Sequence, residues 1–326
     1  MLPDLLRPIA RPSLAVALAG ACLVAAAQGC SSDPARECVV GADCASGQCA
    51  PDGTCVRGPA PDAPTDGGDA SASDATPGAD ASSDAPGDGP TLPGCSPNKD
   101  GIITAAEVPL KAGLRATYRV GTDESVDTAG TKLPDGTRSW DFSVQLASDR
   151  AFLVETLPLA GKWYESKFTG ATYATQLRAS SPELGIFEVS PTAVLLRGVV
   201  TPDGGVFRTE VTHAPPPSML AFPLSMGKKW TADASVSGFV NGVLAPYSES
   251  YTFEVDARGT LKTPLGTFDV LRVQILLERT VGLLKTTVRS FGFVSECYGT
   301  VATVASADNE QDVEFTRAAE LRRISP

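Results

Sequence analysis

The strongest constraint on the fold of this 326-residue chain is an alternation of apolar and polar residues that turn signals interrupt at short intervals. Residues 140–146 place Trp, Phe, Val and Leu at every second position, and residues 251–256 alternate Tyr, Phe and Val with polar residues. Such alternation is typical of strands with one buried face. Long helical periodicity does not accompany it. We therefore predict a mostly β domain over residues 110–326, built as an antiparallel half-barrel, barrel or sandwich.

Three local features refine this prediction. Asn241-Gly242 lies between two apolar pairs and is a strong signal for a two-residue hairpin. The apolar phase slips by one residue between Val270 and Leu271, which predicts a bulge at that point. The triple proline at 215–217 predicts a stiff break, which we interpret as a crossover between two halves of one sheet.

The first 29 residues have the order of an export signal. Arg7 and Arg11 precede an apolar run from Leu14 to Ala27, and Gly29-Cys30 follows it. The run is shorter than the roughly 20 residues that span a bilayer, so it favours a secretory signal over a membrane-spanning helix. An ordinary cleaved signal, with Cys30 incidental, is one interpretation of this segment.

We expect a lipid anchor instead, because Gly29-Cys30 followed by Ser31-Ser32 resembles a bacterial lipoprotein signal. The resemblance implies that residues 1–29 are removed and that Cys30 is acylated, as with palmitate, which anchors the chain in a membrane of the cell envelope. In the enteric-bacterial version of this family, an Asp just after the cysteine retains the protein in the inner membrane. Ser31 at that position therefore implies the outer membrane.

The eight cysteines divide into groups that favour disulfides in an exported chain. Within residues 30–57, the core Asp43–Cys49 resembles that of small Cys-rich modules of secreted Gram-negative proteins. The resemblance implies a disulfide module of unknown connectivity, and a zinc site is the alternative. The cysteines of this module are Cys38, Cys44, Cys49 and Cys55.

Cys95 and Cys297 remain once the signal, the anchor and the module have taken the other six cysteines. We expect a disulfide between them, which would join the start of the β domain to a point near its end. The chain-entropy model gives such a long loop roughly 4–5 kcal/mol of stabilisation.

Residues 58–93 consist almost entirely of Ala, Asp, Gly, Pro, Ser and Thr. Such a stretch buries too little apolar surface to offset the entropy of ordering, so we expect a disordered spacer. Seven Asp residues and no Lys or Arg occur in it, so this linker carries much of the chain's formal net charge of −11. No basic patch stands out elsewhere, which argues against nucleic-acid binding.

Residues 94–109 include a stretch, 96–107, that resembles a twelve-residue EF-hand calcium loop. The resemblance implies weak calcium binding, with a Kd on the order of 10⁻⁴–10⁻³ M. Ser96 replaces the usual Asp at the first position, and Pro109 shortens the exiting helix. A capping box from Thr104 to Glu107 is the alternative. The expected calcium ligands are Asn98, Asp100, the carbonyl of Ile102, and Glu107.

The C-terminal half carries the segments Gly227–Trp230, Leu261–Val270 and Phe291–Val294. Their Thr-Pro-x-Gly-Thr-Phe turn resembles that of uncharacterised bacterial envelope β-proteins, which are similar to the LolA/LolB type of curved half-barrel. The resemblance implies an apolar concavity that carries lipid. The alternative is that the aromatic residues simply fill a β core. The aromatic candidates for a concavity are Trp140, Phe142, Phe152, Trp230, Phe239 and Phe253.

Signatures of catalysis are absent from the sequence. It contains no G-x-S-x-G elbow, no H-E-x-x-H motif and no phosphate-binding P-loop. His213, the one histidine, precedes three prolines and is expected to lie in a loop. Carboxylate pairs such as Glu183 and Glu188 leave a carboxylate-based hydrolase as a third interpretation.

We expect a non-enzymatic envelope lipoprotein that presents its β domain for binding or for structural support. The alternative is a carrier of lipid or of another hydrophobic ligand. The expected partners are the membrane, through the anchor at Cys30, and an envelope protein, matrix or lipid that the sequence does not identify.

Overall fold

The structure, a computed structural model, describes residues 95–108 and 110–326. The predicted signal, the anchor at Cys30, the Cys-rich module and the acidic linker lie outside the described residues. No helix in residues 95–108 and 110–326 is long and apolar enough to cross a membrane. Helical structure in this part of the chain is confined to two short 3-10 turns, η2 (Ala105–Glu107) and η3 (Glu165–Lys167).

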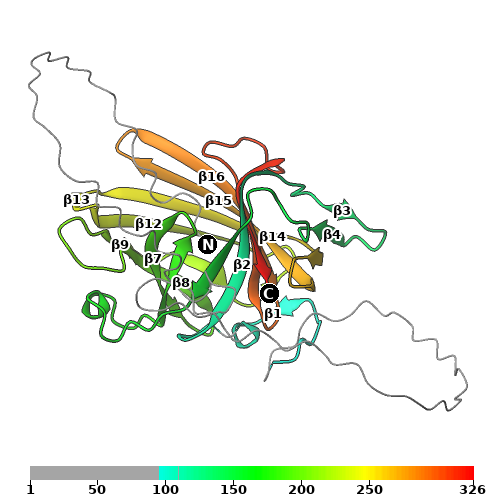
Figure 1. Ribbon diagram of the computed structural model, residues 1–326, viewed down its shortest axis with the longest axis horizontal. Coiled ribbons are helices and arrows are strands. Elements are labelled where there is room, and N and C mark those ends of the chain that lie inside the picture. Colours follow the sequence, from blue (N-terminus) through cyan, green and yellow to red (C-terminus); the bar gives the residue numbers. More distant parts are fainter. Residues whose placement is uncertain (1–94, 109) are drawn as a thin grey trace, which may run out of the picture. The chain divides into compact units, whose positions relative to one another are not determined.

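Twelve antiparallel strands follow one another round a nearly closed barrel (Figure 1). A bridge between Leu157 and Ala174 links the end of the first strand in this path to the last, and so nearly closes the sheet. The predicted mostly β, antiparallel fold is therefore confirmed. In spatial order the strands are β5 (Arg150–Glu155), β2 (Arg115–Ser125), β18 (Arg317–Ser325), β17 (Gly299–Ala305), β16 (Leu284–Ser295), β15 (Thr267–Val281), β14 (Tyr247–Lys262), β12 (Lys229–Val240), β9 (Glu210–Ala214), β8 (Ala193–Val200), β7 (Ser181–Val189) and β6 (Tyr173–Arg178).

Six short strands extend or cover this barrel. β3 and β4 form a hairpin, and β4 also runs parallel to the end of β14. β13 forms the second arm of a hairpin with β12, and β10 pairs with β8. β1 and β11 form a separate two-stranded sheet. Their bounds are β1 (Ile102–Ile103), β3 (Thr131–Lys132), β4 (Arg138–Asp141), β10 (Ser218–Ala221), β11 (Leu224–Ser225) and β13 (Val243–Leu244).

The predicted hairpin at Asn241-Gly242 is confirmed. Phe239 pairs with Leu244 across the β12–β13 turn, and the two turn residues have φ angles of 51° and 77°. Positive φ at both central positions is the geometry that matches the twist of paired strands, and Asn and Gly adopt it at low cost.

The predicted bulge at Val270 or Leu271 is wrong in its position. β15 is continuous there, and the register shifts instead on its neighbour β14, between Val255 and Ala257. Successive side chains of a strand point to opposite faces. Val270 packs in one hydrophobic cluster and Leu271 in another, so both faces of β15 are buried at this point and the apolar pattern loses its alternation.

Two other sequence predictions need correction. The strand expected over residues 140–146 ends at Asp141, whose carboxylate accepts hydrogen bonds from the backbone N–H and hydroxyl of Ser143. The triple proline does not cross between halves of a sheet. It separates two strands that lie along the same edge of β8, because β9 before it and β10 after it both pair with β8. Proline lacks the N–H that a continuous ladder would need.

A second packed layer covers the face of β15 that carries Phe268 and Val270. Trp140 and Phe142 pack edge-on against Phe293 in this layer. Arg272 joins the layer and is only 2% exposed.

The guanidinium of Arg272 binds two carboxylates and an aromatic ring. It donates to Asp256 at 2.6 Å and to Glu314 at 2.7 Å, and it lies 4.3 Å from the ring centre of Phe291. Burial raises the pKa of both carboxyl groups, whereas the charge of Arg272 lowers it. Burial prevails at Asp256 and raises its pKa, whereas at Glu314 the hydrogen bond and charge of Arg272 outweigh burial and lower the pKa.

Replacing this cation should destabilise the fold strongly. We expect Arg272→Met to lower the free energy of unfolding by about 3–5 kcal/mol, because it leaves two partly buried carboxylates without their cation. Arg317→Met is the control, since the Arg317–Asp123 pair is largely exposed and should change stability little. Urea unfolding of both variants measures the difference, and equal effects would contradict the expectation.

Candidate ligand-binding cavity

The barrel contains a cavity of about 450 Å³ that is partly open to solvent. Its wall takes residues from β2, β6, β8, β15, β16 and β17, which lie at both ends and in the middle of the strand order, and none from β14, β12 or β9, so the cavity lies toward one side of the barrel interior. Most of the wall is apolar. The apolar side chains of the wall are Val108, Leu110, Leu114, Ala116, Val154, Phe187, Val194, Met219, Leu220, Leu265, Val273, Ile275, Val294 and Ile324.

The space exists partly because β16 has a glycine where its neighbours are large. Phe291 and Phe293 pack in the layer around Trp140, whereas Gly292 faces the cavity between them. A Cβ added to Gly292 would meet no atom within 4 Å. Gly292 therefore leaves free space in the cavity beside it.

The N-terminal segment of the described chain forms one end of the cavity wall. We call residues 95–114 the strap. Val108, Leu110 and Leu114 of the strap line the cavity, and β1 of the strap pairs with β11.

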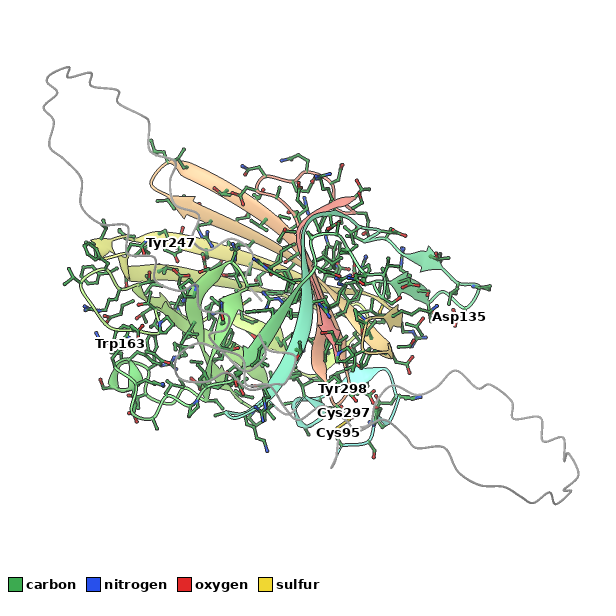
Figure 2. The ribbon with its side chains drawn as sticks, viewed as in Figure 1. Cys95, Asp135, Trp163, Tyr247, Cys297 and Tyr298 are labelled. Atoms are coloured by element: carbon green, nitrogen blue, oxygen red, sulfur yellow. A yellow bond between two sulfur atoms is a disulfide. The ribbon has the colours of Figure 1, made fainter. Side chains whose placement is uncertain are left out.

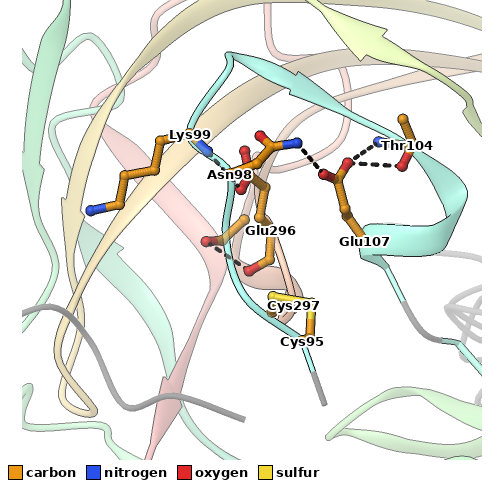
Figure 3. The surroundings of a disulfide bond; sticks show 8 residues. Cys95, Asn98, Lys99, Thr104, Glu107, Glu296 and Cys297 are labelled. Atoms are coloured by element: carbon orange, nitrogen blue, oxygen red, sulfur yellow. Dashed lines mark hydrogen bonds between the residues drawn. A yellow bond between two sulfur atoms is a disulfide. The ribbon is translucent and has the colours of Figure 1, made fainter. Parts of the chain in front are cut away.

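The predicted disulfide between Cys95 and Cys297 is present and holds the start of the strap (Figure 3). Two hydrogen bonds support this attachment. The Cys297 N–H donates to the carbonyl of Glu107 at 2.7 Å, and the Lys99 N–H donates to the carboxylate of Glu296 at 3.1 Å. Cys297 itself lines the cavity, and Figure 2 shows the disulfide beside Tyr298.

Breaking this disulfide should loosen the strap. We expect a Cys95→Ser/Cys297→Ser double variant to lose up to roughly 4 kcal/mol of stability, since the bridge closes a loop across a sequence separation of 202 residues. Limited proteolysis should then cut the strap before it cuts the barrel. A variant whose melting temperature and cleavage pattern match the unmodified protein would contradict this.

The calcium-loop residues lie in the strap, and the structure shows how their side chains bond (Figure 3). The carboxylate of Glu107 accepts hydrogen bonds from the Thr104 N–H and hydroxyl, each at 2.8 Å, and from the Asn98 amide at 2.7 Å. Asp100 accepts from the Ile102 N–H at 2.7 Å. These bonds match the capping-box alternative. No group of three or more His, Cys, Asp or Glu that could hold a metal occurs in residues 95–108 and 110–326.

Calcium binding by Asn98, Asp100, Ile102 and Glu107 stays a prediction from the sequence. We expect calorimetric titration to give a Kd on the order of 10⁻⁴–10⁻³ M and Glu107→Ala to abolish the heat, because this residue supplies the bidentate carboxylate. The absence of heat from the unmodified chain at millimolar calcium would leave Glu107 as a capping residue only.

The six aromatic residues predicted to form a concavity do not line the cavity. Trp140, Phe142 and Phe152 pack in the cluster that includes Phe268, and Phe253 is fully buried with Trp230 stacked on it. The remaining one, Phe239, is 43% exposed near the β12–β13 hairpin. The alternative, that these residues mostly fill a core, describes them better.

The expectation that His213 lies in a loop is wrong. It is in β9, its side chain is fully buried, and its Nε2 lies 3.2 Å from the carboxylate of Glu249. Tyr251 and Arg279 also donate to Glu249. Burial alone would raise the pKa of Glu249, but the His213 hydrogen bond and the Arg279 charge outweigh it and lower that pKa. The His213 side chain does not line the cavity.

A second, polar hollow of about 370 Å³ lies over β12, β14 and β15. Asp233, Ser250 and Glu278 are successive cross-strand neighbours in it, and Lys285 binds Glu278 at 2.6 Å. These residues form a solvated row on a sheet face. Glu183 and Glu188 of β7 lie outside both hollows, and Glu188 is paired with Arg197.

Comparison with known proteins identifies no family. No protein-family model matches the chain, and no curated protein matches it. A crystal structure of a candidate lipoprotein from Parabacteroides distasonis aligns with 10% identity and a TM-score of 0.29. The alignment covers 66% of this chain and 95% of that one. A TM-score this low supports no conclusion about family or function.

Proposed function

We propose that this chain is a non-enzymatic, lipid-anchored envelope protein whose barrel binds a small hydrophobic ligand. The apolar cavity of about 450 Å³ carries the proposal. Its volume falls within the roughly 300–1,000 Å³ of typical ligand sites, and its wall is predominantly apolar, as in such sites. Well-packed interiors contain few voids larger than a water molecule, so a space of this size favours binding over structural support alone.

The position of the domain in the envelope rests on the sequence. The lipoprotein-like signal ending at Cys30 would anchor the chain, and the acidic linker over residues 58–93 would hold the barrel away from the membrane. A tethered barrel with an apolar interior suits the carriage or storage of a hydrophobic molecule. The polar hollow favours catalysis less, because its Glu278 is already paired with Lys285.

Native mass spectrometry tests the proposal directly. The full chain carrying Cys30→Ser, which prevents acylation at that residue, is purified from its own envelope and then extracted with organic solvent. We expect a stoichiometric hydrophobic molecule in the native spectrum that extraction releases. A folded protein that is empty and does not bind a neutral fluorescent naphthylamine probe would overturn the proposal.

Filling the cavity should abolish binding. We expect Gly292→Leu to lose affinity for the naphthylamine probe, because the new side chain occupies free space in the wall. The melting temperature should hold or rise, since a glycine inside a strand contributes no packing. Thr252→Leu is the control, because Thr252 is exposed on β14 and does not line the cavity. Retained probe binding by a folded Gly292→Leu protein would place the ligand elsewhere.

A further inference from the structure

Apart from one arginine, the polar side chains of the cavity wall are of one chemical kind. Of the lining residues in the described part of the chain, Arg115 alone is charged at neutral pH, and it is exposed at the start of β2. No side-chain carboxylate, amide, lysine or histidine that the structure describes lines the cavity. The other polar side chains all carry hydroxyls, and they are Thr117, Tyr118, Thr156, Tyr173, Thr175, Tyr298, Thr300, Thr303 and Ser325.

Two of these hydroxyls are buried and have no hydrogen-bond partner among residues 95–108 and 110–326. They belong to Tyr298, in the turn between β16 and β17, and to Thr175 of β6. Other wall hydroxyls do have partners, since Tyr118 donates to the carbonyl of Thr300 at 2.8 Å and Thr156 to that of Lys111 at 2.6 Å. A buried polar group without a partner is costly, and such groups are few in native proteins. A bound molecule that reaches them would remove this cost.

The charge of the wall limits what that molecule can be. A carboxylate or ammonium group taken into an apolar cavity loses its hydration and needs a buried counter-ion. The wall offers no anion and no buried cation. The phenol of Tyr298 is protonated at neutral pH, as tyrosine ordinarily is, and burial raises its pKa further, so its hydroxyl can donate.

We propose that the cavity takes an uncharged lipid that bears oxygen, such as a long-chain acyl ester, and that the hydroxyls of Tyr298 and Thr175 donate to its oxygen atoms. The acyl chain would lie against Val273, Ile275 and Val294. This inference rests on the proposed function, and it adds the chemical class of the ligand.

Competition among ligands of one chain length tests the inference. The assay measures how well each ligand displaces the neutral naphthylamine probe from the full-length Cys30→Ser chain at neutral pH. The four ligands are methyl laurate, laurate, dodecylamine and dodecane. We expect methyl laurate to bind roughly ten-fold more tightly than the two charged ligands, because only they lose hydration without compensation. It should also bind more tightly than dodecane, which accepts no hydrogen bond.

The outcomes separate the two proposals. Failure of the probe and of every ligand to bind would remove the proposed function. Binding of laurate or dodecylamine as tight as that of methyl laurate would overturn the neutral-lipid assignment while leaving a hydrophobe-binding barrel. Equal affinity for methyl laurate and dodecane would overturn the assignment of the two hydroxyls.

Variants of the two donors give an independent readout. We expect Tyr298→Phe and Thr175→Val each to weaken methyl laurate binding roughly ten-fold and to leave dodecane binding unchanged, since each removes one hydroxyl and nearly no volume. Tyr247→Phe is the matched control, because it makes the same chemical change away from the cavity wall (Figure 2). Thermal melting checks that each variant folds. Unchanged ester affinity in both variants would overturn the assignment.

Discussion

The hydrogen bonding that carries antiparallel pairing from β5 round to β6 is the interaction on which the rest of the structure depends. The bridge between Leu157 and Ala174 turns a long sheet into a nearly closed one. Across the interior, Arg322 of β18 donates to the carbonyl of Leu177 on β6 at 2.9 Å, although the two strands are not neighbours. Closure of this kind removes most exposed strand edges and creates an inside.

The barrel and its interior were only partly predictable from the sequence. The alternation in β14 and the Asn241-Gly242 hairpin follow from local rules, so both were predicted correctly. β15 was misread because a covering layer buries its second face, and periodicity cannot distinguish that from a bulge. His213 was misread for a related reason. Three prolines follow it after Ala214, whereas its partner Glu249 is 36 residues away.

The cavity illustrates a general difficulty in predicting binding sites from composition. Large aromatic residues in the sequence suggest an apolar cavity wall, yet their side chains fill space, so they mark the packed core and not the cavity. Gly292, between two phenylalanines in an apolar strand, was the available signal, because a missing side chain there leaves room. The contributions of Thr175 and of the strap could not have been found in this way, since only the closed sheet brings them to the same wall.

The strap also imposes an order on assembly. It begins the described part of the chain, but its covalent partner Cys297 comes 202 residues later, after every barrel strand except β17 and β18. Since a chain emerges from its N-terminus, this bond can form only when nearly the whole barrel has been synthesised. The strap can therefore be locked onto its end of the cavity only late in synthesis, when β17 and β18 alone are still to be made, and until then noncovalent contacts alone hold it there.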